Sequence, residues 1–217
     1  PGTGRQSAAH RIAETQIPLL KFSILLHDIA KPVVQTTDRD GKRHFYGHEL
    51  RGAQMAELIC RRLKCSKRDT DKIHFLVRHH ARPRLLFTAV HEQNAGPRAL
   101  TRFFMKCAGH MPDLLIIAAA DMLGKQAQPN NRSTAFTAFL NQLRVDYENS
   151  FKPRASGPPL ISGHDLTAEF GLEPSPLYKK ILTRVEEERL SKSDMTRQEA
   201  LNLVRKLIGN QRSNEDR

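Results

Sequence analysis

The sequence predicts an all-α fold, with a helical bundle over residues 1–151 followed by a small helical segment over residues 152–217. Three observations predict this class. Apolar residues recur at the spacing that places them on one face of a helix. The alternating apolar and polar pattern of strands is nearly absent. The connections between the apolar segments are short and polar, as in helical bundles.

Length and charge limit the classes of function. The chain has 217 residues, of which 39% are hydrophobic, so it can bury a substantial core. Its formal net charge of +12 indicates a polyanionic partner such as RNA, or an anionic substrate. The alternative is that lysine and arginine only form solvated helix faces. Basic residues recur along the whole chain instead of filling one tail, which favours the polyanion.

Cysteines and targeting signals give a second set of limits. Cys60, Cys65 and Cys107 form no CxxC pair, so we expect no disulfide framework or thiolate zinc site, and a reducing cytoplasm. The longest apolar run, 114–120, is shorter than the ~20 residues of a membrane span, and the sequence shows no signal peptide, so we expect no membrane partner. The chain starts at Pro1, and we expect it to be a piece of something longer.

The first predicted helix holds the residues around which the chain is organised. Its apolar residues run from Leu19 to Ile29, and its last turn carries His27 and Asp28. Pro32 ends it, because the residue before a proline avoids the helical conformation. Residues 33–47 form a polar loop with a turn signal at 38–41, which allows a small hairpin but no larger sheet.

The next two predicted helices each have histidine at one end. A helix over about 49–63 follows His48. Ser66 and Asp69 resemble a capping box that opens a helix ending in His79-His80. The residues expected to face the core in these two helices are Ala53, Ala56, Leu58, Ile59, Leu63, Ile73, Phe75, Leu76 and Val77.

Shorter helices and a linker complete the chain. Pro83 breaks the helical pattern, and we expect helices near 84–92, 97–108, 113–123 and 133–149, the third of which carries Asp121. Residues 152–159 have the proline and glycine content of a linker, so we place the domain boundary after residue 151. Three more helices are expected near 165–170, 176–190 and 196–208.

Histidines and aspartates at the edges of the apolar segments predict a metal site. Imidazole and carboxylate are ligands for divalent cations, and together they hold one or two ions, among which Mg, Mn, Fe, Ni, Co and Zn are not distinguishable. A bare Asp121 beside the apolar run would be costly to bury, and a metal removes that cost. The predicted ligands are His27, Asp28, His48, His79, His80 and Asp121.

Each of these residues also has an ordinary explanation. Asp121 can reach solvent at a helix end, His48 can be a polar residue before a helix, and His79-His80 can be a surface pair. Their joint occurrence beside His27-Asp28 favours metal. We then expect the ligand atoms of His27, Asp28 and Asp121 to lie within roughly 3 to 4 Å of each other, because metal–ligand bonds are about 2.0 to 2.2 Å long.

At these residues, over about 19–125, the chain resembles the HD-domain metal-dependent phosphohydrolases. Its His-Asp-Ile-Ala-Lys-Pro at 27–32 is similar to the family's His-Asp-Ile-Gly-Lys-Pro, with Ala30 in place of glycine. The stretches 45–53, 76–80 and 159–166 resemble one branch, the HD and C-terminal region of bacterial CCA-adding tRNA nucleotidyltransferases and poly(A) polymerase-like proteins. The carboxylate motif of a nucleotidyltransferase head is absent from the sequence.

The resemblance implies metal-assisted hydrolysis of a phosphomonoester or phosphodiester of a nucleotide or RNA end, in which the metal lowers the pKa of a bound water. Asp28 and Lys31 are the expected catalytic residues. Lys31, Arg78 and Arg82 are expected to bind the phosphate. The upstream histidine ligand of the family has no convincing counterpart, since His10 lies in a polar stretch, so either His10 serves or the ligand lies outside this chain.

Other readings stay open. Glu49 lies next to the site, but we interpret it as a first-turn acid. In the second pair, His164-Asp165, we interpret Asp165 as a helix cap or first-turn acid. The alternative function is an RNA-binding or architectural module, for tRNA-like RNA, with a silent site. A signalling nucleotide hydrolase is a third possibility that no residue singles out. The oligomeric state cannot be read from the sequence.

Overall fold

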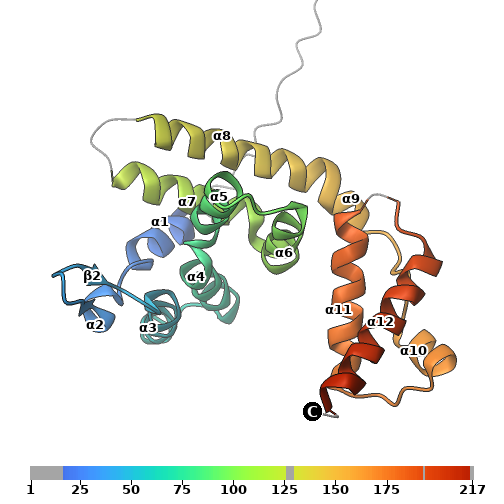
Figure 1. The fold of residues 1–217 in the computed structure, drawn as a ribbon. Helices are drawn as coiled ribbons and strands as arrows, with labels where there is room; N and C mark the ends of the chain where they lie inside the picture. Colours follow the sequence, from blue (N-terminus) through green and yellow to red (C-terminus); the bar gives the residue numbers. More distant parts are fainter. Residues whose placement is uncertain (1–16, 126–129, 193, 216–217) are drawn as a thin grey trace, which may run out of the picture. The chain divides into compact units, whose positions relative to one another are not determined.

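A computed structural model describes residues 17–125, 130–192 and 194–215, and their regular secondary structure is almost entirely helical (Figure 1). This confirms the all-α class. The described residues contain one sheet, in which β1 (Thr36–Thr37) pairs antiparallel with β2 (Arg43–His44), with Thr36 opposite His44. It is the small hairpin that the turn signal allows.

The chain divides into two compact units. One comprises residues 1–87 and 107–144, and the other comprises residues 88–106 and 145–217. This division falls within α5 (Arg82–Glu92) and α8 (Asn131–Asp146). The domain boundary predicted after residue 151 remains a prediction, and each unit is described below by itself.

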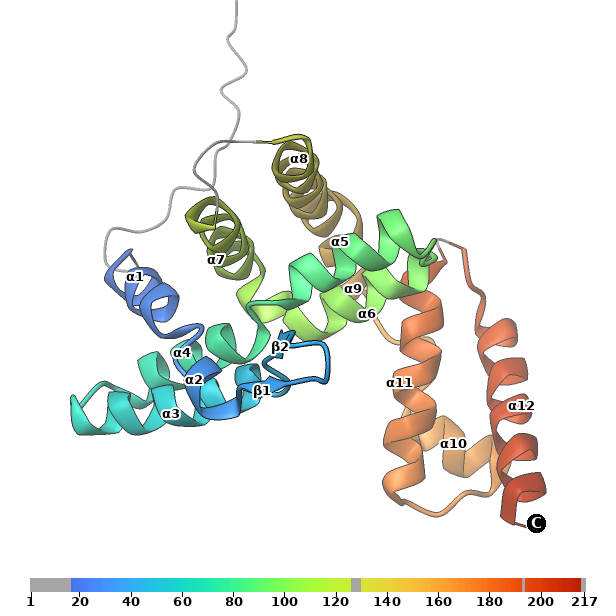
Figure 2. The same cartoon turned by 60° about the vertical axis from the view of Figure 1, so that its left-hand side comes forward.

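Helix α4 (Lys67–His79) is the centre of the first unit. It packs against α1 (Ile17–Leu26), α3 (His48–Arg62) and α7 (Met111–Gly124) (Figures 1 and 2), while the short α2 (Lys31–Val34) contacts α3. Small residues let α3 lie close to its neighbours: a Cβ on Gly52 would be 3.4 Å from Val77 Cγ1 and 3.7 Å from the His27 carbonyl oxygen. The core of this region consists of Leu26, Ala53, Ala56, Cys60, Ile73 and Val77.

The helix starts in this unit follow local chemistry. The Ser66 side chain accepts a hydrogen bond from the Asp69 backbone amide at 3.1 Å, which confirms the expected cap of α4. Helix α5 begins at Arg82, so Pro83 lies in its first turn instead of breaking the pattern. A proline is tolerated there because the first turn needs no amide donor.

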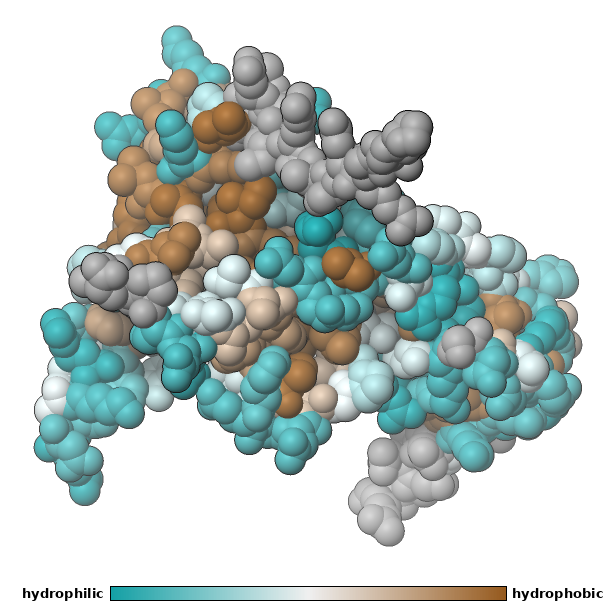
Figure 3. Space-filling model, turned by 90° about the horizontal axis from the view of Figure 1, so that it is seen from above, coloured by the Kyte–Doolittle hydropathy of each residue, from teal (hydrophilic) through white to brown (hydrophobic). Residues whose placement is uncertain are grey.

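Two leucines expected in the core are exposed, Leu58 by 59% and Leu63 by 61%. Leu25, in the apolar stretch of the first helix, is 73% exposed. The buried stripe of α3 passes through Ala53 and Ala56, and Leu58, two residues further on, points about 200° away from Ala56. Hydrophobic residues, brown in Figure 3, are accordingly visible on the surface.

The second unit contains α6 (Pro97–Cys107), whose last residue falls in the first unit, the π-helical η3 (Tyr147–Phe151), α9 (Lys152–Ala155), α10 (Gly163–Phe170), α11 (Pro176–Ser191) and α12 (Arg197–Glu215). Part of the predicted linker is thus helical. The helix tolerates Pro153 because this residue lies in its first turn. The core of this unit consists of Ile161, Leu166, Ile181, Val185, Ala200, Leu201 and Val204.

One stretch of helix, 97–124, is long and apolar enough to cross a membrane by length and composition alone. Half of its most apolar window is buried inside the protein, as in the core helix of a soluble protein. The stretch is also divided by the 3-10 turn η2 (Ala108–His110) into α6 and α7. A single match of this kind is weak evidence for a membrane span.

Candidate metal centre

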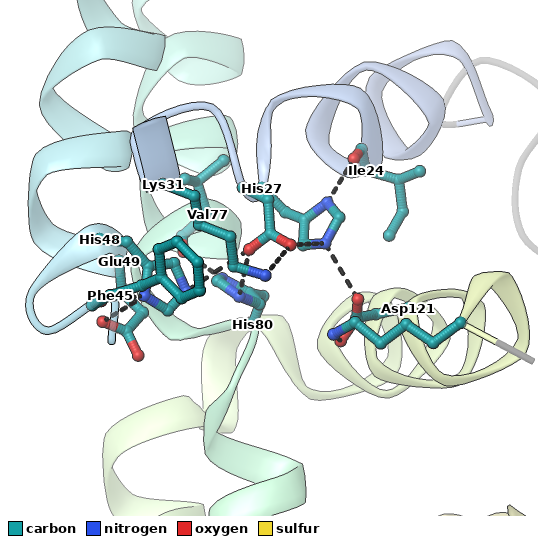
Figure 4. Close-up of polar contacts among 11 residues, drawn as sticks. Ile24, His27, Lys31, Phe45, His48, Glu49, Val77, His80 and Asp121 are labelled. Atoms are coloured by element: carbon teal, nitrogen blue, oxygen red, sulfur yellow. Dashed lines mark hydrogen bonds and ion pairs between the residues drawn. The ribbon is translucent and has the colours of Figure 1, made fainter. Parts of the chain in front are cut away.

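Four segments of the first unit bring histidine and aspartate side chains to one place (Figure 4). Helix α1 ends at Leu26, and His27 and Asp28 lie in the turn directly after it. They are therefore just beyond the helix and not in its last turn, where the sequence predicted them. His48 is the first residue of α3, His80 follows the last residue of α4, and Asp121 lies on α7. Because α4 contacts α1, α3 and α7, its packing gathers these ends together.

His27 lies between two carboxylates. Its Nε2 is 3.0 Å from Asp121 Oδ1 and 3.1 Å from Asp28 Oδ2. Both distances fall in the range expected from the sequence for ligands of one ion. Ligand atoms of His27, Asp28 and His80 all lie within 4.8 Å of one another.

The three histidines of the cluster are held in the same way. In each, Nδ1 donates to the backbone carbonyl three residues earlier: His27 to Ile24 at 2.6 Å, His48 to Phe45 at 2.8 Å, and His80 to Val77 at 2.7 Å. A carbonyl oxygen only accepts, so the proton of a neutral ring is on Nδ1. The lone pair of Nε2 is then directed into the cluster, as in metal-ligating histidines whose other nitrogen is fixed by a hydrogen bond.

Asp28 provides the test of whether these residues fit a metal. Its Oδ1 is buried, and no described residue gives it a hydrogen bond. The atom faces His48 Nε2 at 3.4 Å and His80 Nε2 at 3.7 Å. A buried carboxylate oxygen without a donor is costly, and a cation shared with the two imidazoles would satisfy it. The donor set of imidazole nitrogen and carboxylate oxygen fits a divalent ion.

The electrostatics of His27 point the same way. Burial lowers the pKa of His27, but hydrogen bonds with Asp121 and Asp28 outweigh it and raise this pKa to about 10. Burial raises the pKa of Asp28, yet hydrogen bonds from His27 and Lys31 hold it well below its usual range. The two carboxylates thus favour a positive charge at His27 Nε2, which is a proton when no metal is bound.

The pKa values of Asp121 and His80 are both lowered, for different reasons. Burial raises the pKa of Asp121, but hydrogen bonds from His27 and Lys125 outweigh it and lower the value to about 2. Burial lowers the pKa of His80, which favours the neutral form of its ring. An ionised carboxylate and a neutral imidazole are the forms that ligate metal.

Asp28, His48, His80 and Asp121 line a pocket of about 540 Å³, within the range of small-molecule sites, whereas His27 is not part of its described lining. Lys31 enters this pocket but pairs with Asp28 Oδ2 at 2.5 Å, and Lys125 pairs with Asp121 Oδ2 at 2.7 Å. The described lining is formed by Asp28, Lys31, Arg43, His44, Phe45, Tyr46, Gly47, His48, Glu49, His80, Ala81, Arg84, Asp121 and Lys125.

The structure separates His79 from His80. His79 is buried, its ring contacts Phe75 at 4.5 Å, and its Nδ1 accepts a hydrogen bond from Arg82 Nε at 2.9 Å. The described lining of the pocket includes neither His79, Arg78 nor Arg82. Successive helical residues point about 100° apart, so only one histidine of the pair faces the cluster.

A sequence signal distinguishes the two histidines. Ile73, Leu76 and Val77 form the buried stripe of α4, and His80 continues it at the spacing of three and four. His79 lies four residues after Phe75, on another face. The pocket also contains residues that the sequence did not single out for the site. Lys125 follows Asp121 by one helical turn, a detectable spacing, whereas Arg43, His44, Tyr46 and Arg84 carry no such pattern.

Two further predicted residues, Glu49 and Asp165, have definite outcomes. His10 lies outside the described residues. Glu49 lies in the first turn of α3 as expected and also borders the pocket. Asp165 forms a capping box with Ser162 at the start of α10, which confirms the interpretation of His164-Asp165 as a cap.

The comparison with known families agrees with this geometry. The sequence pattern described as the HD domain matches residues 6–123. That segment contains every residue of the cluster.

Three curated relatives are tRNA nucleotidyltransferases. The A-adding enzyme of Deinococcus radiodurans is 31% identical over 87% of this chain and 41% of its own length. The CC-adding enzymes of Thermus thermophilus and a Synechocystis species are 28% and 26% identical, over 83% and 71% of this chain. The chain therefore spans about two fifths of the length of these relatives: 41% of the first, 38% of the second and 36% of the third.

Proposed function

The chain belongs to the HD domain family, and from this premise we propose that it is a metal-dependent phosphohydrolase acting on nucleotides or RNA ends. We propose further that it does so as part of a protein similar to tRNA nucleotidyltransferases, since it aligns with about two fifths of such enzymes. The observation that carries the proposal is the buried Asp28 Oδ1, which faces two imidazole Nε2 atoms and has no donor among the described residues.

The residues that would hold the ion are His27, Asp28, His48, His80 and Asp121. A divalent ion in such a site lowers the pKa of a bound water and neutralises charge on a phosphoryl group. The imidazole ligands are preorganised, because hydrogen bonds to three backbone carbonyls fix the rings with Nε2 directed into the cluster. Preorganised ligands need no reorientation when the substrate binds.

Basic side chains around the cluster would bind the phosphate. Lys31 pairs with Asp28, and Lys125 pairs with Asp121. If these carboxylates held an ion, both ammonium groups would become available to bind phosphate. Arg84 and Arg43 line the same pocket, and a guanidinium binds phosphate oxygens in a forked geometry. Among the predicted phosphate ligands, Lys31 is supported by its position, while Arg84 is better placed than Arg78 or Arg82.

The test is hydrolysis of bis(p-nitrophenyl) phosphate and of a 3′-phosphorylated oligoribonucleotide with Mg²⁺, Mn²⁺, Fe²⁺, Co²⁺, Ni²⁺ or Zn²⁺ added singly. The chain supplies its own control, because His164 is an exposed histidine in a second His-Asp pair. We expect activity with at least one metal. His27→Ala should lower the rate at least about 100-fold, since the ion contributes several kcal/mol, and His164→Ala should leave it unchanged.

Equal activity of His27→Ala and the wild type would contradict the proposal. So would the absence of hydrolysis with all six metals by a protein that binds them. In the second case, the hypothesis of an RNA-binding or architectural module would replace that of an enzyme.

That second candidate function, an RNA-binding or architectural module, is favoured by the net charge of +12 and by relatives that are tRNA nucleotidyltransferases. It is tested by binding of tRNA at increasing salt. Affinity should fall steeply, because each neutralised phosphate releases counterions. Absence of binding at low salt would contradict it.

A further inference from the structure

A pair of stacked aromatic rings borders the pocket and has no role in holding the ion. The rings of His44 and Tyr46 have centroids 5.2 Å apart and are inclined by only 8°. Both residues line the pocket that contains Asp28, His48 and His80. Tyr46 is 78% exposed, so His44 covers one face of its ring and the rest of the side chain is open.

Hydrogen bonds of Asp38 hold the stack of His44 and Tyr46 in place. Asp38 Oδ1 accepts hydrogen bonds from the backbone amides of Asp40 at 3.0 Å and Lys42 at 2.9 Å, which holds the hairpin turn. Its Oδ2 accepts one from His44 Nε2 at 2.8 Å. His44 is also paired with Thr36 in the hairpin. One carboxylate therefore sets both the turn and the orientation of the ring on which Tyr46 lies.

An isolated exposed aromatic residue is ordinary on a protein surface, but Tyr46 differs in two respects. It already forms one layer of a stack, which leaves a flat face for a further ring, and it borders a pocket that contains phosphate-binding chemistry. Nucleobases stack on aromatic side chains through their π-faces, whatever the base. A phosphate ester without an aromatic ring has no π-face to stack on Tyr46.

The charges around the stack suit the rest of such a ligand. Arg43 and Arg84 line the pocket, and within the described part of the chain neither forms a salt bridge. Guanidinium groups without an acidic partner favour anionic ligands. The volume of about 540 Å³ is in the range of small-molecule pockets.

We propose that Tyr46 is the base-stacking platform of this pocket, and that the ligand is a phosphate ester of a nucleoside whose base lies on Tyr46 while its phosphate reaches the histidine and aspartate cluster. The inference rests on the proposed function and adds the residue that recognises the base of its substrate. The nucleoside phosphate has two sources, a free mononucleotide or the terminal nucleotide of an RNA. Tyr46 is a binding residue in this arrangement, and Asp38 is a positioning residue.

The test is calorimetric binding of adenosine 5′-monophosphate and of ribose 5-phosphate to the complete chain kept in chelator, where no turnover occurs. These compounds differ only in the base. Tyr46→Ala should weaken binding of the nucleotide by roughly 5- to 150-fold, the range measured for base stacking on aromatic residues, and should leave ribose 5-phosphate unchanged. Tyr46→Phe should restore nucleotide binding because it keeps the ring.

Leu58→Ala is the matched control, since Leu58 is an exposed apolar residue of α3 outside the described lining of the pocket, and it should bind both compounds as the wild type does. Asp38→Ala should weaken nucleotide binding alone, which a general loss of structure would not do. A short RNA with a 3′-phosphate distinguishes the sources. If only binding of this RNA depends on Tyr46, the ligand is an RNA end. If binding of the RNA and of the mononucleotide both depend on Tyr46, free nucleotides are ligands as well.

The proposal is overturned if Tyr46→Ala binds both the nucleotide and the RNA as tightly as the wild type does, if it weakens binding of ribose 5-phosphate as much as that of the ligands with a base, or if the wild type prefers neither of those ligands over ribose 5-phosphate. The proposed function fails separately. Absence of hydrolysis of any phosphate ester in the presence of metals contradicts that function, whereas the ratio of the two affinities does not depend on it.

Discussion

The Nε2 atom of His27 lies 3.0 Å from Asp121 Oδ1, although the two residues are 94 positions apart in the chain. This contact joins the turn after α1 to α7. It brings an ionised carboxylate to a nitrogen that already faces Asp28 at 3.1 Å. The first prediction concerns Asp121, because it is the ligand that comes from the most distant part of the sequence.

Asp121→Asn should lower the affinity for Mn²⁺ by more than about 100-fold, since even outer-shell partners of metal sites contribute 10- to 100-fold. Calorimetric titration measures this loss. Asp113→Asn is a matched control on the same helix. Asp113 is buried and pairs with Lys72 at 2.6 Å, so its replacement should lower stability while Mn²⁺ affinity stays as in the wild type. Equal Mn²⁺ affinity of Asp121→Asn and wild type would remove Asp121 from the site.

The adjacent histidines at the end of α4 should respond differently to replacement. His80→Ala removes an Nε2 that faces Asp28 Oδ1 and should weaken Mn²⁺ binding. His79→Ala removes a ring that packs on Phe75. It should lower the free energy of unfolding by about 1 to 3 kcal/mol without changing Mn²⁺ affinity. Urea unfolding and calorimetry separate the two effects, and a larger loss of metal affinity in His79→Ala would reverse this assignment.

Gly47 should be intolerant of a side chain for a backbone reason. Its φ of +76° is left-handed, and a Cβ there would meet nothing within 4 Å. Gly47→Ala should therefore cost about 1 to 2 kcal/mol of unfolding free energy through the backbone alone. Because Gly47 directly precedes His48, we also expect weaker Mn²⁺ binding. Wild-type stability by urea unfolding would show that the turn adopts another conformation.

Asp165 predicts a pH dependence of stability away from the metal centre. Hydrogen bonds from the backbone and side chain of Ser162, and one from Arg197, hold its pKa well below the usual range. A pKa that is lower in the folded than in the unfolded state stabilises the fold above the unfolded value of about 4, and this contribution is lost as pH falls further. The stability difference between wild type and Asp165→Asn should thus be largest at pH 7 and shrink below about pH 4. A difference that is constant with pH would exclude this linkage.

Much of the fold and part of the site follow from sequence pattern alone. The apolar stripes and the Ser66 cap predict the helices of the first unit, and the edges of those helices predict that His27, Asp28 and Asp121 meet. The choice between His79 and His80 depends on which face of α4 is directed at the cluster, because both residues are buried, and the stripe Ile73, Leu76, Val77 indicates that face only if helical phase is followed to its end.

Other features depend on tertiary packing. Leu58 and Leu63 are exposed because the small residues of α3, and not its leucines, face α4. The stacking of Tyr46 on His44 depends on the geometry of a hairpin of two-residue strands, and strands this short have no period that a sequence pattern can reveal. Arg84 lines the pocket from the first turn of α5, which begins at Arg82, before the proline that was expected to break the pattern.

The measurement that tests the central claim most directly is the metal content of the chain and of Asp28→Ala after equilibration with Mn²⁺ and removal of free ion. Asp28 contributes both of its oxygens to the cluster, one beside His27 and one facing His48 and His80. The account predicts about one or two ions retained per wild-type chain and none by Asp28→Ala, with equal helical content by circular dichroism. Equal metal retention by the two proteins would contradict it.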